Sequence, residues 1–181
     1  MANMFISSIN GQTKLKLGYP VISDKYNSKP FILDPATPAP VALGTAVMAT
    51  AVQGTHVAVK DSAVEVTADN INKVVGFILG NNATVPHTFP ADGPDMVYPG
   101  QIGAVCVDGA IAVKFTGETL PEEEDEVYIV TASTASGYAV GDIVDGTEVE
   151  NVTKIELEGW TFMGIADTDE GVQVVAIHKG Y

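Results

Sequence analysis

The side chain with the clearest potential for chemistry is Cys106, the single cysteine of the sequence, within residues 103–115 (GAVCVDGAIAVKF). A catalytic cysteine needs a histidine close in space to take its proton. The three histidines are scattered singly along the chain, at His56, His87 and His178. No cysteine-hydrolase signature surrounds Cys106, and no paired histidines suggest a zinc site. We therefore expect a chain that is not an enzyme, with no catalytic residue, no metal and no cofactor.

The same stretch favours a structural role for the thiol. Two alternating runs flank Asp108-Gly109, a dipeptide typical of a two-residue hairpin turn. Pairing outward from that turn places one set of apolar side chains on a common face: Ile102, Ala104, Cys106, Ile111, Val113 and Phe115. Cys106 is thus predicted to lie in the core, with its pKa raised by burial, whereas Lys114 reaches solvent on the other face.

Carboxylates are abundant, and the densest run is Glu122–Glu126. This run lacks the alternating ligand spacing of an EF-hand loop, so we interpret it as a solvated turn, with casual calcium binding as the lesser alternative. Residues 167–171 (DTDEG) have half of such a spacing but lie between two expected strands, which predicts a hairpin turn. The aromatic residues Trp160, Tyr128, Tyr138 and Tyr181 offer stacking faces for a sugar, although core or rim packing is favoured.

The net charge narrows the choice of partners. It is −14, and all nine basic residues are lysines. Nucleic-acid-binding proteins neutralise phosphates with lysine and arginine clusters, so we expect no nucleic-acid partner. An anionic membrane surface would repel the chain as well, and no apolar run reaches the length of a membrane helix. The absence of an evident signal peptide and of disulfide pairs predicts a reducing compartment such as the cytoplasm.

The elements that must position these residues are nearly all strands. Short alternating or apolar runs bounded by Gly, Pro, Asn or Asp recur from about residue 41, and no window keeps a helical period. The pattern predicts an all-β fold, a compact β-sandwich or β-barrel, with a jelly roll as one form of it. Residues 41–181 form the predicted single β domain, in which residues 81–100 are a proline-rich loop or insertion.

Residues 1–40 differ from this domain. Several prolines disfavour helix there, and they predict an extended N-terminal arm. The arm is rich in large apolar side chains, so it must pack against something, either its own body or another molecule. The arm residues expected to bind a partner are Tyr19, Pro20, Tyr26, Phe31 and Ile32.

The order of the motifs resembles the structural cement, or capsid decoration, proteins of tailed bacteriophages. That family runs from an apolar G-x-A-V entry strand to a V-V-G-F strand, and then through an alternating, glycine-containing hairpin and a G-D-x-V-Y strand to a closing hairpin. The corresponding segments here are residues 44–47 (GTAV), 74–77 (VVGF), 103–113, 126–128 (EVY) and 162–177. The resemblance covers most of residues 19–181, and the 81–100 insertion has no counterpart in it.

The resemblance implies a β-rich accessory protein on the exterior of the virion capsid, which bridges and stabilises major capsid protein subunits. It also implies a homo-oligomer, with a trimer favoured and a dimer possible. Two other functions stay open from the residues alone. One is a carbohydrate-binding or adhesive β-module that uses Trp160, and the other is a hydrolase that uses Cys106 or a carboxylate pair.

Overall fold

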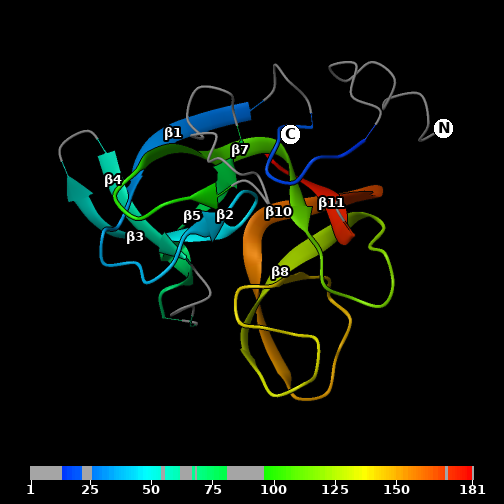
Figure 1. Cartoon of the computed structure of the whole chain (residues 1–181). Coiled ribbons are helices and arrows are strands. Elements are labelled where there is room, and N and C mark those ends of the chain that lie inside the picture. Colours follow the sequence, from blue (N-terminus) through cyan, green and yellow to red (C-terminus); the bar gives the residue numbers. More distant parts are fainter. Residues whose placement is uncertain are drawn as a thin grey trace.

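The computed structural model describes residues 14–21, 26–53, 56–61, 67, 69–80, 96–169 and 171–180 (Figure 1). The strands are β1 (Tyr26–Leu33), β2 (Val41–Ala42), β3 (Ala46–Gln53), β4 (His56–Asp61), β5 (Val74–Leu79), β6 (Met96–Val97), β7 (Ile102–Lys114), β8 (Glu123–Ser133), β9 (Ile143–Val144), β10 (Val152–Asp169) and β11 (Val172–Lys179). A single 3₁₀ turn, Ile71–Lys73, precedes β5 in these ranges. The all-β prediction is confirmed, and no helix of the described residues could span a membrane.

Five strands close into a small barrel. β1 pairs in parallel with β4 and in antiparallel orientation with β7. Antiparallel pairing of β4 with β3, β3 with β5 and β5 with β7 completes the ring. Buried side chains fill its interior and the end covered by the β2–β6 pair: Phe31, Leu33, Val41, Leu43, Val47, Ile78, Val97 and Val105. Of the architectures that the sequence left open, the strand pairing selects a barrel.

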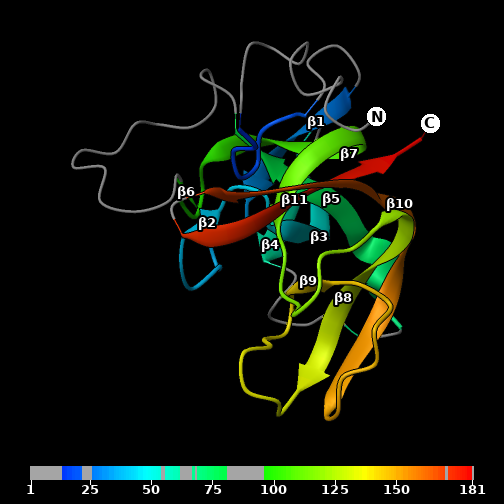
Figure 2. The same ribbon diagram turned by 90° about the vertical axis from the view of Figure 1, so that its right-hand side faces the viewer.

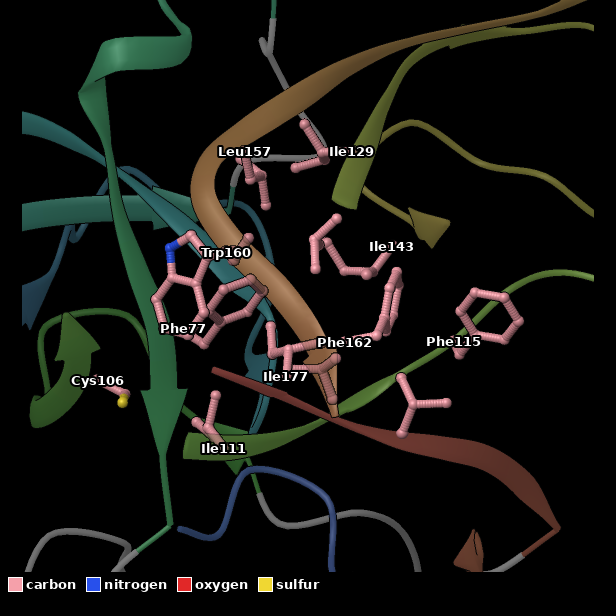
Figure 3. Close-up of a cluster of buried hydrophobic side chains, with 14 of the residues drawn as sticks. Phe77, Cys106, Ile111, Phe115, Ile129, Ile143, Leu157, Trp160, Phe162 and Ile177 are labelled. Carbon is pink, nitrogen blue, oxygen red and sulfur yellow. The ribbon is translucent and has the colours of Figure 1, made fainter. Parts of the chain in front are cut away.

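An open sheet extends from one side of this barrel, in the order β7-β11-β10-β8-β9. The largest apolar cluster lies between this sheet and the outer face of β3 and β5 (Figure 3). Phe77 of β5 meets Trp160 of β10 edge to face, with 5.0 Å between ring centroids. Phe115 and Phe162 make a second such contact at 5.7 Å. The Phe77–Trp160 contact therefore joins the barrel to the sheet, and both contacts have the edge-to-face geometry that ring quadrupoles favour.

The predicted hairpin turn at Asp108-Gly109 is wrong, because β7 runs through both residues as one strand. Its first part pairs with β1 and its second part with β11. The two partners meet at Gly109, which is opposite Tyr26 of β1 and Lys179 of β11. Gly109 has φ of 99°, a conformation that glycine adopts without strain. The Asp-Gly signal thus marks the point at which β7 passes from the barrel into the open sheet.

A β-bulge beside this point preserves most of the predicted core face. Successive residues of β1 pair with Asp108 and Cys106, so Val107 is an extra residue in β7. An extra residue reverses the alternation of faces. The main cluster accordingly contains Ala104, Cys106, Ile111, Val113 and Phe115. Ile102 is the exception, since it was predicted inside and is 54% exposed.

The closing hairpin is confirmed: β10 and β11 pair in antiparallel orientation up to Asp169 and Val172. β10 also pairs with β8, and these two strands project from the barrel as a long ribbon (Figure 2). Of the predicted loop 81–100, residues 81–95 lie outside the described structure, and Met96–Val97 form β6.

The parts of the predicted arm that the structure describes contact the chain's own body. Residues 26–33 form β1 of the barrel, and residues 14–21 lie along β7. The domain division at residue 40 stays a prediction, and residues 1–13 and 22–25 lie outside the described structure.

The close approach of β5 to β7 makes Gly76 a sensitive test of the barrel. Gly76 has φ of 144°, and a Cβ there would overlap the carbonyl oxygen of Cys106. We expect Gly76→Ala to lower the free energy of unfolding by more than about 3 kcal/mol, because the strain and the overlap add. Gly137→Ala is the matched control, since Gly137 has φ of 89° and nothing within 4 Å of an added Cβ. That control should cost about 1–2 kcal/mol in urea denaturation, and equal losses would contradict the barrel closure.

Candidate partner-binding surfaces

Cys106 is buried, as predicted, and its surroundings disfavour nucleophilic chemistry. Its side chain is 0% exposed, and its Sγ donates a hydrogen bond to the carbonyl oxygen of Asp108 at 3.3 Å. Burial raises the pKa of the Cys106 thiol to about 11, so the thiol is protonated at neutral pH. His178 is the one histidine whose side chain the structure describes, and its Nε2 lies 3.0 Å from Thr161 Oγ1.

Two of the four aromatic residues considered for a sugar platform, Trp160 and Tyr128, are already engaged within the chain. Trp160 is 5% exposed and belongs to the core, which confirms the packing prediction. Lys154 Nζ lies 5.2 Å from the centroid of the Tyr128 ring, so a cation already occupies that face. Tyr128 donates its hydroxyl hydrogen to Glu126 Oε2 at 2.7 Å, and this bond raises the pKa of Tyr128 to about 12. Tyr181 lies outside the described residues.

The carboxylates gather on one part of the molecule without forming a metal centre there. We call residues 116–169 the acidic lobe, since they carry fourteen carboxylates and one lysine, Lys154. Glu122–Glu126 are all exposed at the start of β8. Within the described ranges, no three Asp, Glu, His or Cys groups lie close enough to hold a metal ion. The acidic lobe therefore carries −13 of the net charge of −14.

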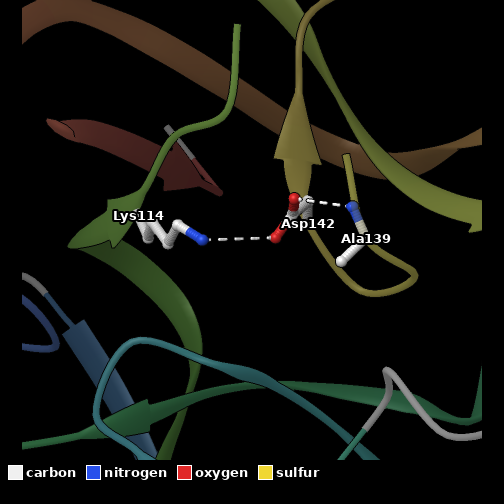
Figure 4. Close-up of polar contacts among 3 residues, drawn as sticks. All are labelled: Lys114, Ala139 and Asp142. Carbon is white, nitrogen blue, oxygen red and sulfur yellow. Dashed lines mark hydrogen bonds and ion pairs between the residues drawn. The ribbon is translucent and has the colours of Figure 1, made fainter. Parts of the chain in front are cut away.

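One ion pair links the acidic lobe to the end of β7 (Figure 4). Lys114 Nζ lies 3.6 Å from Asp142 Oδ1, and Asp142 Oδ2 accepts a hydrogen bond from the Ala139 amide at 3.0 Å. The Lys114 side chain is 56% exposed, as predicted for the solvent face. The Asp142 side chain is 14% exposed, so the pair is only partly open to solvent. Lys114 offsets a single carboxylate, and the acidic lobe together with Lys114 still has a net charge of −12.

The arm segment 14–21 is held on the open sheet by backbone and carboxylate contacts. The amides of Gly18 and Val21 donate to the carbonyl oxygens of Ala112 and Ala110 at 2.8 and 3.0 Å. The amides of Leu15 and Leu17 donate to Oδ2 of Asp167 and Asp169, at 3.2 and 3.0 Å. The segment covers a third apolar cluster formed by Val21, Ala110, Ala112, Val174 and Ala176.

The five arm residues predicted to bind a partner lie in different surroundings. Tyr19 is half-buried against the barrel-interior cluster, with Lys16 Nζ 4.5 Å from its ring centroid. Pro20 is half-buried opposite Ile111 of β7, and Tyr26 packs against the main cluster. Phe31 is 0% exposed inside the barrel. Ile32, on the opposite side of β1, is half-buried beside Ile102.

Sequence reasoning missed two exposed apolar side chains near β1. Tyr98 lay in the predicted loop, and Ile102 was assigned to the core face; they are 37% and 54% exposed. The absence of charge from residues 96–107 was the available signal.

The described residues form a small barrel extended by an open sheet, and the single thiol of the sequence is buried in it. A family model described as structural cement protein (E217 gp24/Pam3 gp6) matches residues 11–177. The chain therefore belongs to this family of phage structural cement proteins, and the resemblance inferred from its motifs is confirmed. Membership implies a non-enzymatic structural role in association with a virion capsid.

Comparison with solved structures supports the fold. A chain in the structure titled "The capsid of Myoviridae Phage XM1" matches with a TM-score of 0.57 and 13% sequence identity. The match covers 96% of this chain and 94% of that chain. A search of curated proteins gives no match.

The buried thiol predicts a specific loss of stability at high pH. The unfolded chain releases the Cys106 proton at an ordinary pKa of 9.0, whereas the folded chain retains it up to about 11. The stabilisation by the neutral thiol is complete below pH 9 and is lost as the pH rises through 11. Relative to Cys106→Ala, the free energy of unfolding should fall by up to about 1.4 kcal/mol per pH unit in this window. Urea denaturation between pH 7 and 11 measures this difference, and a constant difference would contradict the assignment.

The carboxylate contacts of the arm segment predict a second, local effect. In Asp167→Ala/Asp169→Ala, the amides of Leu15 and Leu17 lose their acceptors, so their hydrogen exchange should accelerate by about tenfold or more. Asp142→Ala is the matched control, because it removes a carboxylate whose amide partner lies in another loop. NMR-detected exchange that is equally fast in the unsubstituted protein would show that the segment is not held there.

Proposed function

We propose that this chain is a cement protein that binds the exterior of an assembled phage capsid and bridges neighbouring major capsid protein subunits. The family match over residues 11–177 carries the proposal. The fold agrees with it, because a closed barrel extended by a sheet provides a rigid body on which a repeated contact can be built.

The charge supports a position outside the shell. The interior of a filled capsid holds densely packed, polyanionic nucleic acid, which repels a chain of net charge −14 without arginine. On the exterior, the acidic lobe faces solvent, where uncompensated charge of one sign keeps particles apart. Synthesis in the host cytoplasm precedes this assembly.

We propose that the arm residues with exposed surface contact a partner directly, and that the buried one acts by holding its strand in place. Tyr19, Pro20 and Tyr26 are half-buried, so each retains some surface for a capsid subunit or a sister copy. Ile32 is likewise half-buried on the outward side of β1. Phe31 contributes indirectly, because its buried ring fixes the position of β1.

A homo-oligomer fits the same function, with a trimer favoured over a dimer. Three copies around a local threefold position of a capsid meet three equivalent sets of subunits. Many such contacts, each modest, would together resist the internal pressure of the packaged genome.

The proposal predicts saturable binding and a gain in capsid stability. Purified capsids of the parent phage, prepared without this chain, should bind it in a fixed ratio to the major capsid protein during sedimentation. The loaded capsids should release DNA at a higher temperature, because binding to the assembled state stabilises that state. Heat-denatured protein at the same concentration is the control, and absence of co-sedimentation would overturn the proposal.

A further inference from the structure

An uncharged surface lies at the end of the barrel where β1 leaves it. Ile32 and Ile102 are cross-strand partners in the β1–β7 ladder, so their side chains lie on the same face. Ile102 is the most exposed of the large apolar residues that the structure describes, at 54%. An exposed isoleucine beside a half-buried one adds little to the hydrophobic core, but it offers apolar area that a binding partner could bury.

Neighbouring segments extend this surface. The Leu33 amide donates to the Gln101 carbonyl oxygen at 2.9 Å, and the Gly100 amide donates to the Leu33 carbonyl oxygen at 2.7 Å. These bonds fix the turn that carries the exposed Tyr98 beside the end of β1. The loop after β1 adds exposed proline and alanine side chains. We call the combined surface the neutral patch: Ile32, Pro35, Ala36, Pro38, Tyr98 and Ile102.

The neutral patch differs in charge from the acidic lobe. Residues 35–53 and 96–107 contain no charged side chain. Among the described residues, the charged side chains that directly adjoin these two ranges in the sequence are Asp34 and Asp108. Both carboxylate oxygens of Asp34 are engaged, Oδ1 with the Ala36 amide at 2.9 Å and Oδ2 with Thr50 Oγ1 at 3.1 Å.

The two surfaces also point in different directions. The loop after β1 lies at one side of the barrel, and the β8–β10 ribbon of the acidic lobe projects away from it in both views (Figures 1 and 2). Among the described residues, the uncharged apolar surface and the acidic ribbon therefore face different directions.

We propose that the neutral patch is the surface that docks on the capsid shell, against an uncharged apolar area of the major capsid protein. This inference rests on the proposed function, and it adds which face binds and what chemistry the partner offers. The charge distribution favours the shell over a second copy as occupant. Two copies joined through their neutral patches would direct one acidic lobe toward the shell, whereas docking on the shell directs every acidic lobe toward solvent.

Binding through an uncharged surface has a distinctive salt dependence. Contacts between charged surfaces weaken steeply as salt screens them, whereas burial of apolar area does not depend on that screening. The apparent Kd for capsids should therefore change by less than about threefold between 50 and 500 mM NaCl.

Two matched substitutions test the face directly in a capsid-binding titration. Ile102→Glu introduces a charge into the neutral patch and should weaken binding by about tenfold or more. Leu120→Glu introduces the same residue at a site in the acidic lobe that is 48% exposed, and it should leave Kd within about twofold. Tyr98→Ser is a second patch variant that adds no charge and should weaken binding in the same direction.

The outcomes separate this inference from the function on which it rests. Failure of the unsubstituted protein to bind would remove the proposed function itself. Normal binding by Ile102→Glu, with loss in Leu120→Glu or a steep salt dependence, would assign docking to the acidic lobe and overturn the inference. A change only in oligomer size by light scattering, with capsid binding intact, would assign the patch to a second copy and would likewise overturn it.

Discussion

The architecture depends on β7, the one strand shared by the barrel and the open sheet. β1 and β5 use its first part to close the barrel, and β11 uses its second part to begin the sheet. Its bulge at Val107 and the positive φ of Gly109 change its direction between the two. Residues before and after the bulge consequently share one face, and a single cluster fixes the sheet against the barrel. Without that change of alternation, the side chains on one side of the bulge would lie on the opposite face of β7 from this cluster.

This arrangement also separates charge in space. The barrel consists of sequence with few ionisable groups, whereas the projecting ribbon and its loops contain most of the carboxylates. Carboxylates placed close together repel one another at a cost in stability, and a sequence without function there would have little reason to concentrate them. The proposed docking accounts for this separation, because the acidic lobe would stay in contact with water while the neutral patch would be buried against the capsid.

The sequence predicted the strand content and the closing hairpin, because each rests on local alternation. The burial of Cys106 was predicted from a hairpin that does not form, and it holds because the bulge at Val107 keeps the same residues on one face. The prediction failed at Asp108-Gly109, since a dipeptide that suits a turn also suits a bend within a strand, and only long-range pairing with β1 and β11 decides between them. The barrel itself was beyond local reasoning, because ring closure joins β1 to β4 and β7 across long stretches of chain.

The candidate binding surface, too, was predicted only in part from the sequence. Apolar residues of the arm were visible in the sequence, but their partition into buried Phe31 and outward Ile32 depends on which face of β1 meets the interior. Ile102 was assigned to the core because its strand was assumed to be covered along its whole length, whereas the cluster ends before it.

We propose that this chain binds the outer surface of the capsid through its barrel and turns its acidic lobe toward solvent. Cryo-electron microscopy of parent capsids, with and without added protein, tests it most directly. We expect additional density on the exterior at repeated positions between capsid subunits, with the barrel against the shell and the β8–β10 ribbon outward. Density inside the shell, or on the exterior with the ribbon against the shell, would contradict it.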